Sequence, residues 1–571
     1  MGSVPNVKLA PWTYMLIRML FKFVLKVFYS SIVIENENFI PGNGRPTIIC
    51  ANHGNSLTDA LMLITSVSSK KRNYLRMTAK ATLFGKRTFS SWLIENVGSV
   101  PIKRRQDNPE DSDNTIAMNS LTQALEEGDV ICLFPEGMSK FQSKLSPLKS
   151  GVARIASDVL TRNAANPDFE LTLLTCSITY VHPQRFRSDV LVTFHPPLHL
   201  RPSTHPSLVR DSPTSPPPFD SIQSLTRLIQ TQISSGTIDA PSWEIVRISK
   251  TAARMYSPLG TRMSLGDWIR VVRTFVGGFA QESGGLVVEP GQGPAGTDPD
   301  RDRIEILALI RDLKAYQDNL VKLGVKDDRV RRLVSRPTMA KRILFRTMWL
   351  CILLPITLPG LTLWLSVFAT ASYFGEKMKK SGPAQDVWDE IAQQKLIYGL
   401  LSGGLVWLIC AVSLLPFSLL MFPVVPLWMW MTLRWFEDLV STFRAIKALS
   451  IMLMMPPKTL AEMQEKREEL HERVHAFALR LGLPDDPEDF FVMDPNVRKG
   501  KGIFESSTDG EDDGETRTSA WGSWFGGPQD RSQKGRARLY FSIVRRRKRD
   551  WNETLKWYDM TEFPEDATKI E

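Results

Sequence analysis

Cysteine is scarce in this chain. Only five cysteines occur among 571 residues, and they show neither C-x-x-C spacing nor pairing with any of the seven histidines. Because each lies inside an apolar run, we interpret them as buried thiols in a reducing compartment, which argues against a disulfide framework and against a metal site. They are Cys50, Cys132, Cys176, Cys351 and Cys410.

A cleavable signal peptide is also lacking. Lys8, Arg18, Lys22 and Lys26 interrupt the apolar segment of the first 30 residues, and that segment has no small-residue cleavage site. We therefore expect the N-terminal part of the chain to face the cytosol.

Nucleic-acid-binding motifs are absent as well, although the chain is basic. The formal net charge of +10 suits an anionic partner. No helix-turn-helix, zinc-finger or aromatic–basic RNA motif is present, so we predict no nucleic-acid partner. The remaining candidates are an acidic membrane surface and a phosphorylated or CoA-bearing substrate.

The length of the chain predicts several folded units rather than one core. Over residues 31–275, short β-branched runs alternate with helical ones, which predicts an α/β domain with a mixed, largely buried sheet flanked by helices. The expected strands are 31–35, 47–51, 73–77, 130–134, 171–180 and 189–194, and the expected helices include 58–68, 116–127, 149–163 and 221–235.

The first 30 residues predict an amphipathic helix. Arg18, Lys22 and Lys26 are spaced four apart, so they share one helical face, whereas apolar residues such as Met19 and Phe23 cover another. This pattern is typical of a helix lying in the membrane interface, with the cations reaching toward the headgroups. A surface helix of the folded domain is the alternative.

A composition change at 276–302, rich in Gly and Pro, predicts a disordered linker. An amphipathic helical connector is expected at 303–340, and a transmembrane region at 341–435. Within that region, 347–374 and 396–433 contain no charged residue, and both exceed the roughly 20 residues that cross a bilayer core.

The second uncharged stretch contains Pro416, Pro423 and Pro426. These prolines leave three possibilities open: one kinked span, a span with a re-entrant piece, or two spans. We expect the region to form a hairpin with both of its ends in the cytosol, giving two or three spans.

The C-terminal part is expected to hold a helical segment at 436–494 and a disordered tail at 495–571. The tail is first acidic, at 505–515, and then basic, at 534–549. A membrane-surface contact tuned by phosphorylation is the alternative to plain disorder.

Chemistry is first indicated by the stretch "IICANHGNSLTDALMLI" at 48–64. An imidazole held by a carboxylate removes protons from alcohols, and His53 and Asp59 could form such a pair. On a continuous helix their side chains would point about 240° apart, so a turn must bend the chain, with Ser56 or Thr58 capping the following helix. The alternative is a core histidine followed by an ordinary first-turn acid.

Two further stretches carry charged residues at the ends of predicted elements. In "NVGSVPIKRR", 96–105, a glycine and a proline precede cations suited to binding a phosphate. In "CLFPEGMSK", 132–140, a carboxylate and a glycine follow a buried strand, a place suited to binding substrate hydroxyls.

Together, the NH-x5-D block, the G-x-x-P-x-x-R block and the F-P-E-G block resemble the glycerophospholipid acyltransferase family in order and distance. The stretch at 177–198 and the long, apolar C-terminal half are similar to its fungal membrane-bound branch, which acts on glycerol 3-phosphate and dihydroxyacetone phosphate. Two features depart from the common family pattern. Five residues, rather than four, separate His53 from Asp59, and Ser139 is followed by Lys140 rather than by His or Arg.

The resemblance implies that His53 is the general base and that Asp59 orients it. It implies an acceptor site in which Gly98 shapes the loop that bears the cations. The acceptor-binding residues implied are Gly98, Lys103, Arg104, Glu136 and Gly137. The candidates for contact with the phosphates of CoA are Lys80, Lys86, Arg185 and Arg187, for which surface decoration is the alternative.

The implied activity is acyl-CoA-dependent acylation of glycerol 3-phosphate at its sn-1 hydroxyl, and of dihydroxyacetone phosphate, giving lysophosphatidic acid. Acyl-CoA is then a co-substrate, and no tightly bound cofactor or metal is expected. The alternatives are a lysophosphatidic acid acyltransferase and a catalytically silent membrane scaffold. The implied location is the endoplasmic reticulum membrane, multi-pass with a cytosolic catalytic domain, or the lipid droplet. Membrane lipids are expected partners, and the oligomeric state is left open.

Overall fold

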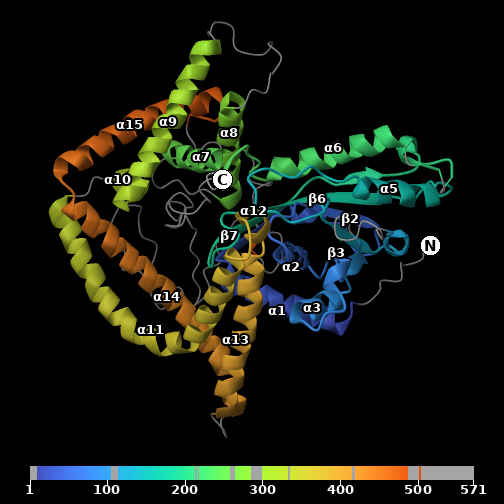
Figure 1. Cartoon of the computed structure of the whole chain (residues 1–571), viewed down its shortest axis with the longest axis horizontal. Helices are drawn as coiled ribbons and strands as arrows, with labels where there is room; N and C mark the ends of the chain where they lie inside the picture. Colours follow the sequence, from blue (N-terminus) through green and yellow to red (C-terminus); the bar gives the residue numbers. More distant parts are fainter. Residues whose placement is uncertain are drawn as a thin grey trace, which may run out of the picture. The chain divides into compact units, whose positions relative to one another are not determined.

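The computed structural model describes residues 10–103, 113–212, 215–216, 218–257, 264–283, 299–331, 335–413, 418–485 and 501–502. Most of the predicted linker and most of the predicted tail lie outside these residues. The described part contains an α/β domain and a set of long helices (Figure 1).

A mixed sheet of nine strands forms the centre of the α/β domain, with the order β4-β3-β5-β2-β6-β7-β1-β9 and β8 paired with β6. Strand β2 lies between β5 and β6 and runs parallel to both, whereas β7 is antiparallel to β6. The predicted mixed α/β fold is confirmed. The strands are Ser31–Glu35 (β1), Thr47–Ala51 (β2), Arg76–Lys80 (β3), Val100–Ile102 (β4), Val130–Leu133 (β5), Leu171–Tyr180 (β6), Asp189–Phe194 (β7), Leu198–Leu200 (β8) and Lys501–Gly502 (β9).

Both faces of the sheet are covered, which explains why its strands are apolar at consecutive positions. Ile49 and Ala51 of β2 face one hydrophobic core, and Ile48 and Cys50 face the other. The helices of the first core are Trp12–Phe28 (α1), Leu57–Ser66 (α2) and Phe89–Asn96 (α3), and those of the second are Thr115–Glu126 (α4), Gly151–Arg162 (α5) and Phe219–Gly236 (α6).

Several strands differ from the prediction. Strands β4 and β8 were not expected, and β5 ends at Leu133 rather than at residue 134. Strand β3 begins at Arg76 rather than at residue 73, because the preceding residues make other contacts: the Asn73 N–H donates to Asn43 and the Leu75 N–H to the Tyr14 hydroxyl. Strand β9 falls in the segment expected to be disordered, and it pairs with β1.

Helix α1 forms where an amphipathic helix was predicted, but its polar and apolar residues are not distributed between core and solvent as expected. Arg18 is buried and donates to the carbonyl of Val67, the C-cap of α2, and to that of Arg72 in the loop that follows. The three cations therefore do not share a solvent-facing side. The face turned away from the core is apolar, with exposed Trp12, Met15, Leu16, Met19 and Phe23.

A third hydrophobic core lies among helices that follow the sheet in sequence. It contacts the sheet through Val181 and Leu191. Helix α8 continues past residue 276, where the linker was expected to begin. The helices of this part are Trp243–Tyr256 (α7), Leu265–Ser283 (α8), Pro299–Leu323 (α9), Asp327–Arg331 (α10) and Pro457–Arg480 (α15), and the 3-10 turns of the chain are Glu37–Phe39 (η1), Ala81–Leu83 (η2) and Pro206–Leu208 (η3).

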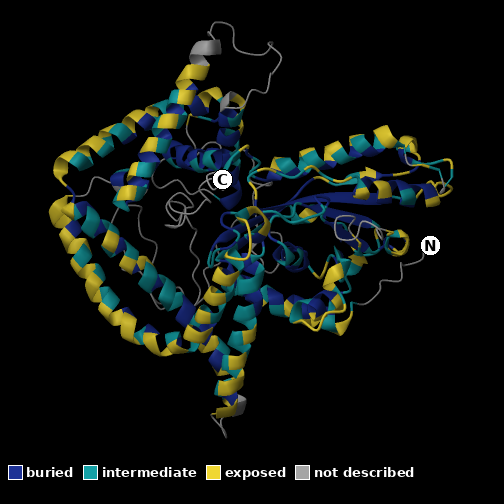
Figure 2. Ribbon diagram, in the orientation of Figure 1, coloured by how far each residue is buried: buried dark blue, intermediate teal, exposed yellow. Residues whose placement is uncertain are grey.

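The apolar stretches form three long helices, α11, α13 and α14. Helices α11 and α13 are each long and apolar enough to cross a membrane, and a third span results if α14 and α15, which meet at a bend of 109°, count as one. Many of their apolar side chains are exposed (Figure 2). The helices are Arg336–Lys379 (α11), Ala384–Val387 (α12), Ile391–Ser413 (α13) and Ser418–Met454 (α14).

Candidate active site

His53 and Asp59 meet at the C-terminal end of β2. After β2 ends at Ala51, the chain turns sharply through Ser56, whose φ is 46°, and α2 begins at Leu57. The His53 Nδ1 then lies 3.0 Å from the Asp59 Oδ2. The side chain of His53 is 13% exposed and that of Asp59 only 1%. The histidine is therefore the accessible member of a buried pair.

The Asp59 carboxylate is fixed by hydrogen bonds to both of its oxygens. Oδ2 also accepts from the Asn55 N–H at 2.8 Å, and Oδ1 accepts from the Tyr180 hydroxyl at 2.7 Å. The Asn55 side chain donates in turn to the Tyr29 hydroxyl at 3.0 Å. Burial raises the pKa of Tyr180 well above its ordinary value, so its hydroxyl remains a donor.

This arrangement determines the tautomer of His53. A carboxylate only accepts hydrogen bonds, so the Nδ1 of a neutral imidazole must carry the proton that faces Asp59. The Nε2 atom is then left with its lone pair, which is the state a general base needs. The ring of Phe134 stacks on the imidazole at 4.3 Å and limits its rotation.

Glu136 contacts the backbone of the loop that carries His53. Its Oε1 accepts from the backbone N–H of His53 at 2.6 Å, and its Oε2 accepts from the Ser146 N–H at 3.2 Å. Burial raises the pKa of Glu136, and the hydrogen bond from His53 opposes this increase. The two oxygens thus hold the loop that carries His53, a contact that sequence reasoning did not anticipate.

Two predicted glycines stand where a larger residue would not fit. Gly137 has a φ of 78°, and an added Cβ would lie 2.5 Å from the Lys149 Nζ. Gly98 has a φ of 68° and leads from α3 to β4, and its added Cβ would lie 1.6 Å from the Tyr74 hydroxyl oxygen. Both turns therefore need glycine for backbone conformation, and at Gly98 the ring of Tyr74 also leaves no space for a side chain.

The predicted phosphate-binding cations are less well placed by the structure. Lys103 is exposed at the end of β4, and its backbone N–H donates to Asn114. Arg104 lies outside the described residues. The assignment of these two residues to the acceptor phosphate stays a prediction.

The four candidates for CoA contact lie in different parts of the α/β domain, apart from Arg185 and Arg187, which share one turn. Lys80 ends β3 near Glu390, and Lys86 is exposed before α3. Arg185 and Arg187 lie in the turn between β6 and β7.

Arg187 has structural partners in that turn. It forms an ion pair with Glu437 of α14 and donates to the carbonyls of Lys26 and Val27 in α1, each at 3.2 Å. These contacts join α1 to α14 and favour a structural role for Arg187.

A segment far away in sequence completes the site. A second connecting segment, called the connector from here on, comprises residues 384–395, which include α12 and the first turn of α13. It packs against the loops that carry His53 and Glu136. Its Gln393 Oε1 accepts from the Ser56 hydroxyl at 3.1 Å and from the Leu57 N–H at 3.3 Å. The Gln385 carbonyl accepts from the Phe141 N–H at 2.9 Å, and the Trp388 ring lies 5.4 Å from that of Phe141.

These contacts also correct the predicted cap of α2. The side chain of Ser56 occupies the N-cap position but makes no capping hydrogen bond, and the Thr58 hydroxyl has no partner among the described residues. Instead, Gln393 accepts from the Leu57 N–H, and the Ser139 hydroxyl accepts from the Ser56 N–H at 2.9 Å. The ends of helices require such partners, and here they come from other loops.

Asp389 of the connector is a third carboxylate near His53, after Asp59 and Glu136. It is 3% exposed, and its Oδ1 has no hydrogen-bond partner in the described part of the chain. Burial raises its pKa, while a hydrogen bond from Ser139 and the nearby His53 oppose this increase. In the sequence, the position of Asp389 near the site is hinted at by the polar residues of 389–395, which lie between two apolar stretches.

The assembled groups suit proton abstraction from a hydroxyl. A neutral imidazole with a fixed tautomer, a buried carboxylate behind it and a loop held by Glu136 are the requirements of general-base catalysis. Within the described ranges, no group of three or more His, Cys, Asp or Glu side chains stands close enough to hold a metal ion.

Comparison with known proteins agrees with this chemistry. Residues 31–179 match the model of the acyltransferase family, and residues 296–386 match that of the glycerol-3-phosphate acyltransferase 2 C-terminal domain. An uncharacterized acyltransferase of Schizosaccharomyces pombe is 26% identical over 81% of this chain and 68% of its own length.

Two proteins of Saccharomyces cerevisiae are also similar. Glycerol-3-phosphate O-acyltransferase 2 is 20% identical over 84% of this chain and 78% of its own length. Glycerol-3-phosphate O-acyltransferase 1 is 24% identical over 63% of this chain and 47% of its own length.

Proposed function

We propose that this member of the acyltransferase family, whose acyltransferase domain covers residues 31–179, transfers an acyl group from acyl-CoA to the sn-1 hydroxyl of glycerol 3-phosphate. The observation that carries the proposal is the pairing of His53 with Asp59, because it leaves the Nε2 of an accessible imidazole as a base. The distant relation to the yeast glycerol-3-phosphate O-acyltransferases supports this choice of acceptor.

The reaction proceeds by direct transfer. The Nε2 of His53 takes the proton of the acceptor hydroxyl while its oxygen attacks the thioester carbonyl, forming a tetrahedral adduct. The C–S bond then breaks, CoA leaves as a thiolate, and the imidazolium returns its proton to the sulfur. Asp59 stabilises the imidazolium between these two steps.

The same site would acylate dihydroxyacetone phosphate, which presents the same terminal hydroxyl and phosphate. The product formed from glycerol 3-phosphate, lysophosphatidic acid, has an acyl chain that partitions into a membrane, and the apolar helices would keep the site beside that membrane. We assign the protein to the endoplasmic reticulum, with its catalytic domain in the cytosol.

The test is CoA release by the purified full chain in detergent, given palmitoyl-CoA with glycerol 3-phosphate, dihydroxyacetone phosphate or lysophosphatidic acid. His53→Ala should abolish turnover. His199→Ala is the matched control, because this histidine is 49% exposed and pairs with Glu170 on the surface.

Turnover with the two water-soluble acceptors, lost only in His53→Ala, is the expected result. Turnover with lysophosphatidic acid alone would assign the protein to the following acylation. Activity that survives His53→Ala would refute the mechanism, and silence with every acceptor would favour a scaffold.

A further inference from the structure

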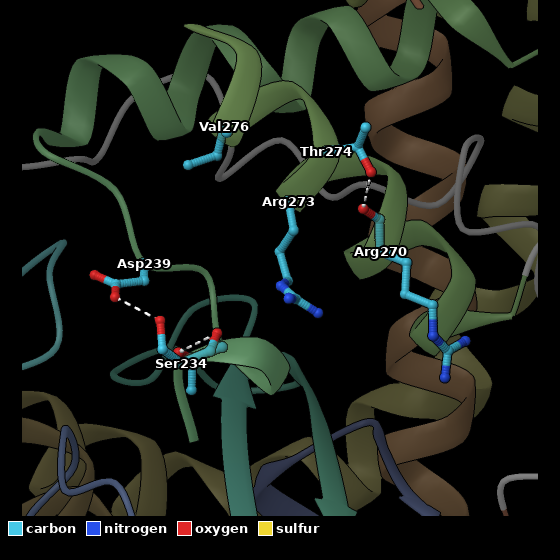
Figure 3. Close-up of a pocket in the computed structure, with 8 residues that line it drawn as sticks. Ser234, Asp239, Arg270, Arg273, Thr274 and Val276 are labelled. Carbon is cyan, nitrogen blue, oxygen red and sulfur yellow. Dashed lines mark hydrogen bonds between the residues drawn. The ribbon is translucent and has the colours of Figure 1, made fainter. Parts of the chain in front are cut away.

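A cavity outside the His53 site lies between the C-terminal end of α6 and the middle of α8 (Figure 3). Its volume is about 350 Å³, which lies at the lower end of the range of small-molecule sites. The side chains used below are Ser234, Thr237, Asp239, Arg270, Arg273 and Thr274.

Arg273 is the unusual member of this lining. Its side chain is half-buried and extends into the cavity in Figure 3. Burial and the neighbouring Arg270 both lower its pKa. Across the described part of the chain, its side chain forms no hydrogen bond or ion pair. A guanidinium stays charged in proteins, so this half-buried charge lacks a counter-ion among the described residues.

The other charged groups around the cavity already have partners. Arg270 pairs with Glu35 and with Asp267, each at 2.8 Å. Asp239 accepts from the Leu145 N–H at 3.0 Å and from the Ser234 hydroxyl at 2.7 Å, and in Figure 3 its carboxylate turns away from Arg273.

His195 lies near Arg273 but is not charged at neutral pH. Burial, and to a smaller extent the charge of Arg273, lowers the pKa of His195 to about 4. Its Nε2 lies 2.7 Å from the Ser177 hydroxyl. Asp239 is an anion that lines the same cavity, but among the described residues it forms no ion pair with Arg273.

We propose that Arg273 binds a phosphate group of an anionic ligand that enters this cavity. The planar guanidinium presents two parallel N–H groups that match two phosphate oxygens. The hydroxyls of Thr237 and Thr274 now donate to backbone carbonyls of Ser234 and Arg270, and they could reorient toward the same oxygens. Ligand binding would provide the missing counter-charge.

The ligand has two possible sources: the nucleotide end of an acyl-CoA donor and the headgroup of an anionic lipid. The cavity and the candidate active site share one loop, because Leu145 binds Asp239 and the next residue, Ser146, binds Glu136. Three hydrogen bonds, the peptide unit from Leu145 to Ser146 and the carboxylate of Glu136 connect the Asp239 carboxylate to the His53 backbone nitrogen. The two ends of this route therefore lie within roughly 15 Å of each other.

This proximity favours the CoA source. CoA carries its nucleotide phosphates at the opposite end from the thioester, so they must bind away from His53. This preference rests on the proposed function, whereas the phosphate site itself does not.

The experiment measures binding rather than turnover, so it is independent of the acyltransferase assay. The full chain in nanodiscs is titrated with CoA, 3′-dephospho-CoA and inorganic phosphate, and vesicles containing phosphatidic acid are compared with neutral vesicles. Arg273→Gln and Arg273→Lys are compared with wild type. Arg154→Gln, which removes an exposed arginine of α5, is the control.

We expect Arg273→Gln to weaken binding of the recognised phosphate ligand roughly tenfold or more, as expected for a lost charge-assisted hydrogen bond. Arg273→Lys should bind with intermediate affinity, and Arg154→Gln as wild type. Without ligand, Arg273→Gln should unfold at the same temperature as wild type or higher, because an uncompensated charge is removed.

Each result decides the matter. Loss of CoA binding supports the site with CoA as the source, and loss of binding only to phosphatidic acid vesicles supports it with lipid as the source. Wild-type affinity of Arg273→Gln for every probe would overturn the proposal, as would a wild type that binds none of them. A lower unfolding temperature of the ligand-free variant would identify a structural arginine and also overturn it.

Discussion

At the scale of single residues, the site depends on how completely Asp59 is hydrogen-bonded. It accepts from His53, from the Asn55 N–H and from the Tyr180 hydroxyl. A buried carboxylate with fewer donors would be costly and could rotate, and the tautomer of His53 would no longer be fixed. Tyr180 should therefore influence catalysis without touching substrate.

Tyr180→Phe tests this influence. Removal of the hydroxyl leaves the Asp59 Oδ1 buried without a donor, an effect of about 1–3 kcal/mol. We expect kcat to fall roughly tenfold while KM for either substrate changes little. Steady-state kinetics provide the measurement, and Tyr373→Phe, at an exposed tyrosine of α11, is the control. An unchanged kcat would show that Asp59 orients His53 without Tyr180.

Asp389 gives a prediction about stability and pH. Its pKa is raised from an ordinary value of 3.8 by burial, so its ionised form destabilises the folded state. The stability that protonated Asp389 contributes is complete below the unfolded pKa and is lost as pH rises through the raised folded pKa. Asp389→Asn, which does not ionise, should therefore be more stable than wild type at neutral pH.

This difference should disappear in acid. Thermal unfolding of both proteins from about pH 8 to pH 4 should show melting temperatures that converge as the pH falls toward the ordinary aspartate range. Asp168→Asn, at an exposed aspartate, should match wild type throughout. A constant offset between Asp389→Asn and wild type would mean that Asp389 does not change its protonation in this range.

Some residues of the site could be predicted from the sequence, and others could not. The arrangement of His53 with Asp59 follows from short motifs, because the motif residues lie within one turn of the chain. Asp389 and Gln393 come from more than 300 residues away, and no local pattern indicates that they pack there. Such contacts depend on tertiary structure, which periodicity does not describe.

At the scale of elements, the alternation of short β-branched runs with helical segments predicted the buried strands well. Each of these strands is a continuous apolar run, which is easy to recognise in the sequence. Strands β1, β2, β6 and β7 have the predicted bounds. The polarity of α1 was misjudged, since spacing alone does not show which face packs on the core. Arg18 lies on the buried face because the carbonyls of Val67, at the end of α2, and of Arg72, in the following loop, accept its N–H groups.

The N-terminus of α2 shows how one element depends on another. Gln393 of the connector holds the first turn of α2, which carries Asp59. Gln393→Leu removes the oxygen that accepts from both the Ser56 hydroxyl and the Leu57 N–H. Donors left unpaired cost about 1–3 kcal/mol, so we expect kcat to fall roughly tenfold with little change in KM. Steady-state kinetics with both substrates check this expectation.

A second substitution distinguishes positioning from packing. Gln393→Glu keeps the oxygen acceptors and adds a negative charge that is favourable at a helix N-terminus, so it should restore most of kcat. Gln394→Leu, at the adjacent glutamine, should leave kcat unchanged. If Gln393→Glu is as impaired as Gln393→Leu, the hydrogen bonds to α2 are not the cause.

At the scale of the whole molecule, both ends of α11 contact parts of the chain that pack on the α/β domain. At its start, the Arg336 side chain donates to the Met455 carbonyl, and Met339 belongs to the core that includes Val181. Near its end, Phe368 packs on Phe186, and the connector that follows contacts the His53 loop.

The length of α11 makes these contacts informative. A helix of 44 residues is about 66 Å long, roughly twice the thickness of a bilayer core. It contains Pro355 and Pro359, which weaken the helix and allow it to bend. We therefore predict that α11 enters and leaves the membrane on the catalytic side, whereas α13, which starts from the connector, is the helix that crosses.

Single cysteines in a cysteine-free background test this topology in sealed microsomes. Ser335→Cys and Ser381→Cys flank α11, and Ser69→Cys, in an exposed loop of the α/β domain, marks the catalytic side. All three should react with a membrane-impermeant maleimide added outside, without detergent. If Ser381→Cys reacts only after permeabilisation while Ser335→Cys and Ser69→Cys react before it, α11 crosses the membrane once. The connector could then not reach Ser56, and Gln393→Leu should have no effect on kcat.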